Sequence, residues 1–237
     1  MTEHAESPPT RRASTIPGWP EIIAGLVGYA LAYFASPYLI DGIGGDEGVV
    51  RGLVASALSG LTGLVGFFAA LLVRRRGWRA FGVRAVGWRW LALAVGLGLV
   101  AFILARTVYA VLGALGALPD ADPQQDYRAA AGGGALALVL QLLFIAVLTP
   151  IGEEFLFRGV LVSSLRRYSA VLAIAVSTML FLVAHGLNLT LLPAALVGIL
   201  SALLLLRTGS IWPGVVVHGV NNGIGTVLEL VLRGVSA

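Results

Sequence analysis

The stretch ALALVLQLLFIAVLTPIGEEFLFRGVLVSSL, residues 135–165, places two adjacent carboxylates and an arginine inside an otherwise apolar segment. A helix needs about 20 apolar residues to cross the hydrocarbon core of a bilayer, and this run is longer than that. Ionisable groups within such a segment are costly and usually serve a function. The stretch therefore predicts a membrane helix that carries part of a functional site.

The composition of the whole chain points the same way. Of 237 residues, 58% are hydrophobic and 12% are charged, with a mean hydropathy of +0.91. A soluble domain has about a quarter of its residues charged. The composition predicts an all-α fold, a polytopic transmembrane helical bundle. The chain contains no cysteine, which excludes thiol catalysis, disulfides and cysteine-ligated metals.

The apolar runs predict about seven spans. They cover residues 22–40, 49–73, 90–118, 134–165, 170–187, 190–206 and 211–232. We expect a disordered tail over residues 1–20, N-terminal transmembrane helices over 21–133, and a functional group of helices over 134–237. The tail is polar and proline-rich and lacks the apolar core of a cleavable signal peptide.

The arginines predict the orientation of these spans. All 16 basic residues are arginines, and most lie in short loops, so membrane topology explains them better than a nucleic-acid partner does. The loop RRRGWRAFGVRAVGWR, residues 74–89, contains six arginines and no acid, and is expected in the cytoplasm. The same rule places the N-terminus in the cytoplasm of a multi-pass protein of the cell membrane.

The acidic pair of the fourth span has two distinct environments. Glu154 and Arg158 are four residues apart, in the acid-first order that favours pairing on a helix. Glu153 is rotated by about 100° from Glu154 and does not share that pairing. Glu153 is thus available to accept a proton from water. Pro150 removes a helix hydrogen bond nearby, and the resulting kink would open a polar cavity.

Two later spans each carry one histidine. In FLVAHGLN, Phe181 and His185 share a helix face, and in HGVNN, His218 and Asn222 do the same. A histidine with an amide one turn further along can bind a water or an oxyanion. Asn221 lies on another face and is expected to pack or to form a hydrogen bond.

Depth allows the polar residues of the three spans to meet. At the rise of a helix, Glu153, His185, His218 and Asn222 all lie between about a third and three quarters of the way across a hydrocarbon core of about 30 Å. The overlap in depth predicts one site made from three late helices.

The ordered trio EEFLFRG, FLVAH and HGVNN resembles the CPBP intramembrane proteases. This family includes the type II CAAX prenyl endopeptidases and the bacteriocin-processing, Abi-like proteins. Its pattern of EExxxR, FxxxH and HxxxN is matched by residues from about 134 to 232. The resemblance implies an intramembrane endopeptidase in which Glu153 activates water and His185, His218 and Asn222 complete the catalytic site. Glu154, Arg158 and Phe181 would be supporting residues.

The resemblance leaves the metal question open. The family is often called a metalloprotease, and Glu153, His185 and His218 would be a plausible zinc set. The same residues would also work without zinc, with Glu153 deprotonating the water and the others stabilising the oxyanion. The expected substrate is a membrane-associated peptide or protein.

Two other classes of function compete with the protease. A proton-coupled transporter would use Glu153, His185 and His218 as a relay or an ion site, and a non-catalytic membrane scaffold would keep the fold without the activity. Transporters commonly show two similar halves, and this sequence shows no such symmetry.

Overall fold

In the computed structural model, residues 16–43, 48–116, 130, 133–186 and 188–235 are described. Those residues form helices and no strand, which confirms the all-α prediction. The predicted disordered tail lies largely outside them, because residues 1–15 are not described. The same holds for residues 117–118, the predicted end of the third span.

The helices follow the expected spans, with boundaries shifted by a few residues. They are α1 (Trp19–Asp41), α2 (Gly48–Val73), the short 3-10 helix η1 (Trp78–Phe81), α3 (Trp88–Ala114), α8 (Ala170–His185), α9 (Leu191–Thr208) and α10 (Trp212–Val235). The fourth span is a composite of α5 (Ala135–Leu143), η2 (Phe144–Leu148), α6 (Thr149–Glu154), η3 (Phe155–Val162) and α7 (Ser163–Leu165).

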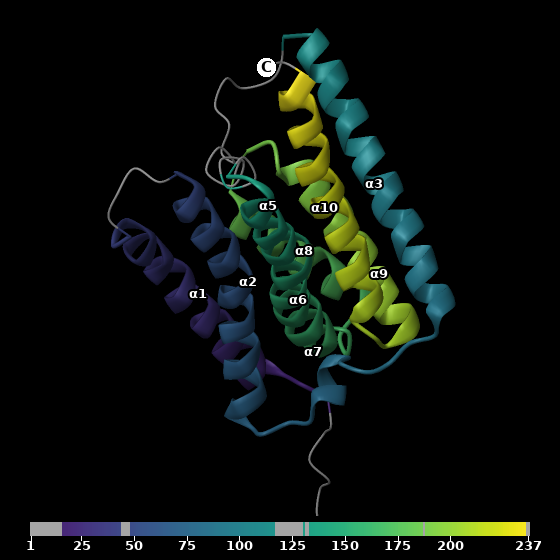
Figure 1. The fold of residues 1–237 in the computed structure, drawn as a ribbon. Helices are drawn as coiled ribbons and strands as arrows, with labels where there is room; N and C mark the ends of the chain where they lie inside the picture. Colours follow the sequence, from purple (N-terminus) through teal and green to yellow (C-terminus); the bar gives the residue numbers. More distant parts are fainter. Residues whose placement is uncertain (1–15, 44–47, 117–129, 131–132, 187, 236–237) are drawn as a thin grey trace, which may run out of the picture.

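The composite helix is the centre of the bundle. Figure 1 shows α1 and α2 on one side of it, with α8, α9 and α10 on the other and α3 outside α10. Its C-terminal part is buried continuously from Gly152 to Leu165, where it contacts α2 and α8. Glu153, Glu154 and Arg158 thus lie in the core of the molecule.

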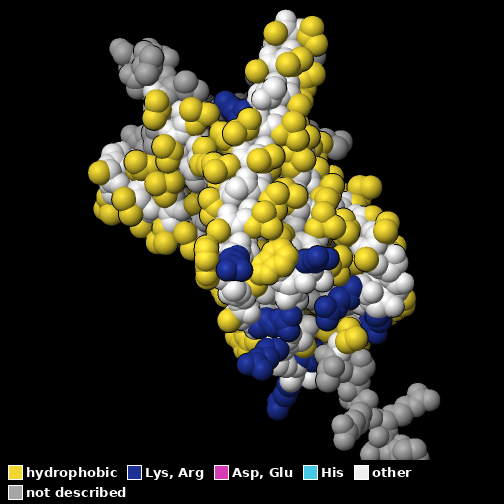
Figure 2. Space-filling view, turned by 90° about the vertical axis from the view of Figure 1, so that its right-hand side faces the viewer, with side chains coloured by type: hydrophobic (Ala, Val, Ile, Leu, Met, Phe, Trp, Pro, Cys, Tyr) yellow, Lys and Arg dark blue, Asp and Glu magenta, His cyan; other side chains and the backbone are white. Residues whose placement is uncertain are grey.

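The outer surface fits a bilayer. Five helical segments of the described chain are long and apolar enough to cross a membrane: α1, α2, α3, the composite helix and α9. α8 is apolar but only 16 residues long, and α10 carries polar residues along its 24. Large apolar side chains such as Leu31, Phe34 and Val171 are exposed on the outer wall, which is mostly hydrophobic in Figure 2. The chain is a multi-pass membrane protein.

Most of the described arginines lie at one end of the bundle. Figure 2 shows most of the basic side chains in this view gathered below a hydrophobic wall, with another near the upper end. α2 and α9 end at this level, α3 and α10 begin there, and all five tryptophans of the chain lie on the adjoining residues. Tryptophans and arginines together mark the interface between membrane and water. Glu21 is fully buried here and is held by Arg74 and Arg76.

Glycines bring α2 into backbone contact with α6. A Cβ added to Gly63 would lie 2.4 Å from the carbonyl carbon and oxygen of Gly152, and one added to Gly152 would lie 1.9 Å from the carbonyl oxygen of Gly60. No side chain fits between the two helices at these points. Small residues allow membrane helices to approach in this way. The contact holds α2 against the segment that carries Glu153.

We expect Gly63→Ala to destabilise the protein by about 1–3 kcal/mol, because the added methyl group must displace rigid backbone. Gly96→Ala on α3 is the matched control, since a Cβ there meets no atom within 4 Å. Thermal unfolding in detergent measures both variants. Equal melting temperatures would show that the backbone contact between α2 and α6 is not required for stability.

Candidate functional site

Pro150 sets the local path of the composite helix. The preceding segment η2 is π-helical, and the Thr149 N–H donates to the carbonyl of Phe144, five residues back. The next bond in this register would join residue 150 to the carbonyl of Ile145, but proline has no N–H. The Ile145 carbonyl instead accepts a hydrogen bond from Asn222 Nδ2, at 3.1 Å. The carbonyl that Pro150 leaves without a backbone donor thus forms a hydrogen bond that links the composite helix to α10.

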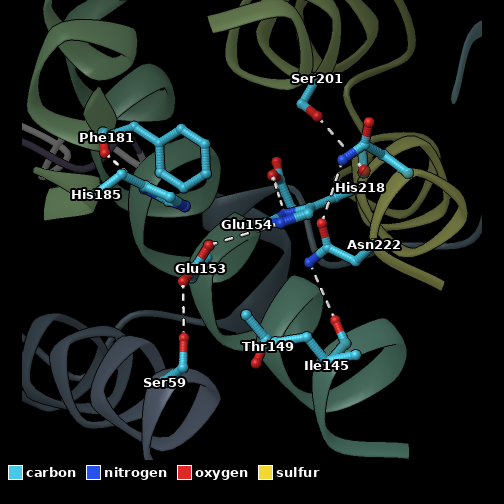
Figure 3. Close-up of polar contacts among 12 residues, drawn as sticks. Ser59, Ile145, Thr149, Glu153, Glu154, Phe181, His185, Ser201, His218 and Asn222 are labelled. Atoms are coloured by element: carbon cyan, nitrogen blue, oxygen red, sulfur yellow. Dashed lines mark hydrogen bonds and ion pairs between the residues drawn. The ribbon is translucent and has the colours of Figure 1, made fainter. Parts of the chain in front are cut away.

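Glu153 lies on α6, between α2 and α10. Its side chain is nearly buried, with 6% exposure. Ser59 Oγ of α2 donates to Glu153 Oε1 at 3.2 Å, and the other carboxylate oxygen lies 3.7 Å from His218 Nε2 (Figure 3). This second distance is too long for a hydrogen bond and leaves Oε2 without one among the described residues. One oxygen of Glu153 is held and the other is available.

Glu154 is fully buried and has two charged neighbours. Its Oε2 lies 3.1 Å from Arg158 Nε, so the expected ion pair is present. Its Oε1 lies 3.2 Å from His218 Nδ1, a contact that the sequence analysis did not predict. His218 therefore lies between two adjacent carboxylates, with Nδ1 facing Glu154 and Nε2 facing Glu153.

The Phe181 ring contacts both Arg158 and His185. Its ring centroid lies 4.4 Å from the Arg158 guanidinium carbon and 4.4 Å from the His185 ring. A cation over an aromatic face in a buried site is favourable. The Phe181 carbonyl also lies 2.9 Å from His185 Nδ1. Since a carbonyl only accepts, His185 carries its proton on Nδ1 and keeps Nε2 as an acceptor.

A cavity of about 610 Å³ connects these groups. Glu153, His185, His218 and Asn222 all line it, so the structure brings the four predicted catalytic residues to one space. Of the predicted supporting residues, Phe181 also lines the cavity, whereas Glu154 and Arg158 lie behind the site and are fully buried. The remaining lining comes from the halves of the helices far from the arginine end, and includes tyrosines, apolar side chains and Arg106.

Ser59 and Asn221 are polar residues of the site that were not singled out as site residues in the sequence analysis. Ser59 was overlooked because the prediction was built from ionisable groups within the spans and from asparagines of the late helices, although Ser56, Ser59 and Thr62 recur at helical spacing along α2. Asn221 was expected to pack or to form a hydrogen bond on a face other than that of Asn222. It lines the cavity, and its Nδ2 donates to Asn222 Oδ1 at 3.3 Å. That bond orients the Asn222 amide.

The donor geometry does not form a zinc site. In the part of the chain that the structure describes, no three His, Asp or Glu side chains are arranged to hold a metal ion. The suggested set of Glu153, His185 and His218 includes a histidine whose two ring nitrogens both face carboxylates. We therefore derive no chemical step through a metal.

Comparison with known proteins identifies the segment that carries the site. No curated protein and no solved structure gave a significant match. A family model described as type II CAAX prenyl endopeptidase Rce1-like matches residues 135–224, from the start of α5 into α10. This range contains the three motifs, and the match confirms the resemblance that they suggested. Residues 135–224 of this membrane protein are similar to a family of proteases, the type II CAAX prenyl endopeptidases.

Proposed function

We propose that the protein is an intramembrane endopeptidase that hydrolyses a peptide bond in a membrane-associated peptide or protein. The observation that carries the proposal is the placement of Glu153, His185, His218 and Asn222 around one cavity. All four residues belong to the segment that matches the Rce1-like family model. These residues belong to the composite helix, α8 and α10, and only the packing of these helices brings them together. A prenylated peptide that ends in a CAAX sequence is the first substrate to test, because the matched family is named for it.

Glu153 acts as the general base. Ser59 holds Oε1, and Oε2 faces the cavity side where His218 Nε2 lies. A water at Oε2 loses a proton to Glu153 as its oxygen attacks the scissile carbonyl carbon. The His185 Nε2 acceptor helps to orient that water. Glu153 then returns the proton to the amine nitrogen as the carbon–nitrogen bond breaks, which yields a free acid and a free amine.

Asn222 and His218 stabilise the oxyanion of the tetrahedral intermediate. One N–H of the Asn222 amide is bound to the Ile145 carbonyl, so the second N–H is held in a defined direction. Glu154 orients His218 through Nδ1. Because Glu154 accepts from Nδ1, the proposed oxyanion role requires a second proton on Nε2, and the charge of His218 and that of Arg158 would then balance the two carboxylates. A buried group of four charges is tolerated when it is balanced in this way.

The orientation and cellular location follow from the arginine end. We propose that this end faces the cytoplasm, with the N-terminus on the same side, in the cell membrane. The cavity then occupies the half of the bundle nearer the opposite face. A protease reaction of this kind needs both water and a peptide at the site, and a cavity of about 610 Å³ has room for several residues of a substrate.

Glu153→Gln tests the mechanism. We expect cleavage of a prenylated CAAX peptide in proteoliposomes to fall by at least about 100-fold, because the amide is isosteric but accepts no proton. Melting temperature and detergent-gel filtration are expected to be unchanged. Full activity in Glu153→Gln would disprove the assigned role, and a wild-type protein that cleaves no membrane-tethered peptide would favour the scaffold or the transporter.

Arg158→Gln tests the supporting pair. We expect a loss of about 3–5 kcal/mol of stability and a low folded yield, because Glu154 would remain buried without its cation. Arg207→Gln is the control: it also removes one arginine, from the exposed last turn of α9. Folded yield after purification and thermal unfolding measure the difference. Equal behaviour of the two variants would show that the buried ion pair is not structural.

Removal of metal tests the scheme without zinc. We expect the purified, active protein to contain less than stoichiometric zinc and to keep its rate after dialysis against a chelator. Elemental analysis and the cleavage assay, run on the same sample, provide the two measurements. Loss of activity that zinc alone restores would overturn the assignment of Glu153 as an unassisted base.

A further inference from the structure

A second, smaller pocket lies at the arginine end, away from the cavity that contains Glu153. It has a volume of about 70 Å³. Its lining includes three arginines, Arg79, Arg84 and Arg166, together with Ser163. The three arginines give the lining of this small space a positive charge, which attracts an anion.

The pocket is built by three separate segments. Arg79 and Arg84 come from η1 and the loop after it, Ser163 and Arg166 from the end of the composite helix, and Gly209 from the turn between α9 and α10. Backbone and side-chain hydrogen bonds connect the loop after η1 to the turn between α9 and α10. The Ile211 N–H donates to the Gly82 carbonyl at 3.0 Å, and Ser210 Oγ donates to the Arg84 carbonyl at 2.7 Å.

Arg84 is held in place before any ligand arrives. Its Nη2 donates to the Thr208 carbonyl at 2.7 Å. The guanidinium packs against Gly209, where a Cβ would lie close to the same nitrogen. Gly209 has a positive φ of 68°, which glycine adopts without strain. Arg84 is exposed, and its hydrogen bond to the Thr208 carbonyl directs it toward this turn.

Arg79 and Arg166 supply uncompensated charge. Both are exposed, and neither forms an ion pair with an acid among the described residues. At this end of the described bundle the only acid is Glu21, which is buried and already bound by Arg74 and Arg76. The pocket therefore has a net positive charge that no acid of the described residues neutralises.

We infer that this pocket binds a phosphate group. Arginine forks match the oxygens of phosphate in geometry and charge. The volume is more than twice the ~30 Å³ of a water molecule, enough for a headgroup phosphate but not for a whole lipid. The adjacent Trp78, 45% exposed, lies beside Arg79 at the level of the interface, where the phosphates of a bilayer are found.

Two sources share this chemistry, an anionic phospholipid headgroup and free inorganic phosphate. Either ligand would contact the loop after η1, the end of the composite helix and the turn that leads into α10. Binding would thereby stabilise the helices that carry Glu153 and His218, although it is independent of whether those residues catalyse hydrolysis.

The test uses the full-length protein in detergent. Native mass spectrometry measures retention of added phosphatidylglycerol against phosphatidylcholine, and thermal unfolding measures the effect of inorganic phosphate against chloride at matched ionic strength. We expect Arg79→Gln and Arg166→Gln each to weaken binding by about tenfold, the effect of one lost charge-assisted hydrogen bond. Arg75→Gln is the matched control, an exposed arginine of the same end that does not line the pocket.

The outcomes separate the two sources and decide the inference. Selective retention of phosphatidylglycerol without an effect of phosphate supports the headgroup, and stabilisation by phosphate alone supports the free ion. Binding of neither ligand by the wild-type protein would overturn the inference. Equal weakening by Arg75→Gln and Arg79→Gln would also overturn it, because the affinity would then come from the general charge of this end and not from the pocket.

Discussion

The ion pair between Arg158 and Glu154 is the constraint on which the rest of the site depends. Both side chains are fully buried in the centre of the bundle, where neither charge is solvated by water. Pairing compensates part of that cost. Because Arg158 takes one oxygen of Glu154, the other oxygen is free to meet His218 Nδ1. The pair thereby positions an imidazole that belongs to a helix more than 50 residues further along the chain.

Two features of the backbone bring side chains of neighbouring helices to the site. Glycines on α2 and α6 remove the side chains that would separate these helices, and this brings Ser59 to Glu153. Pro150 leaves the Ile145 carbonyl without its partner in the π-helical register, and Asn222 of α10 occupies it. In both cases a missing group allows a contact between helices. The missing group is a Cβ at the glycines and an N–H at the proline.

The molecule separates its polar groups along the membrane normal. The cavity and its lining polar residues, Arg106 included, lie in one half, and most of the described arginines lie at the end of the other half. The composite helix spans both, with Glu153 and Glu154 near its middle and Ser163 near its end. A ligand at the arginine end would therefore contact the same composite helix that carries the acidic pair.

Apolar run length and helical spacing in the sequence determined the all-α membrane fold, the approximate spans and the pairing of Glu154 with Arg158. These features depend on composition or on neighbours within one helix. Only the tertiary structure decided that Ser59 holds Glu153, that Glu154 faces His218, and that Asn221 shares the cavity with Asn222. Helical periodicity relates residues along one helix but carries no information about which other helix lies beside it. That choice depends on the close approach of backbones and on carbonyls left without partners, and both arise only when the helices pack.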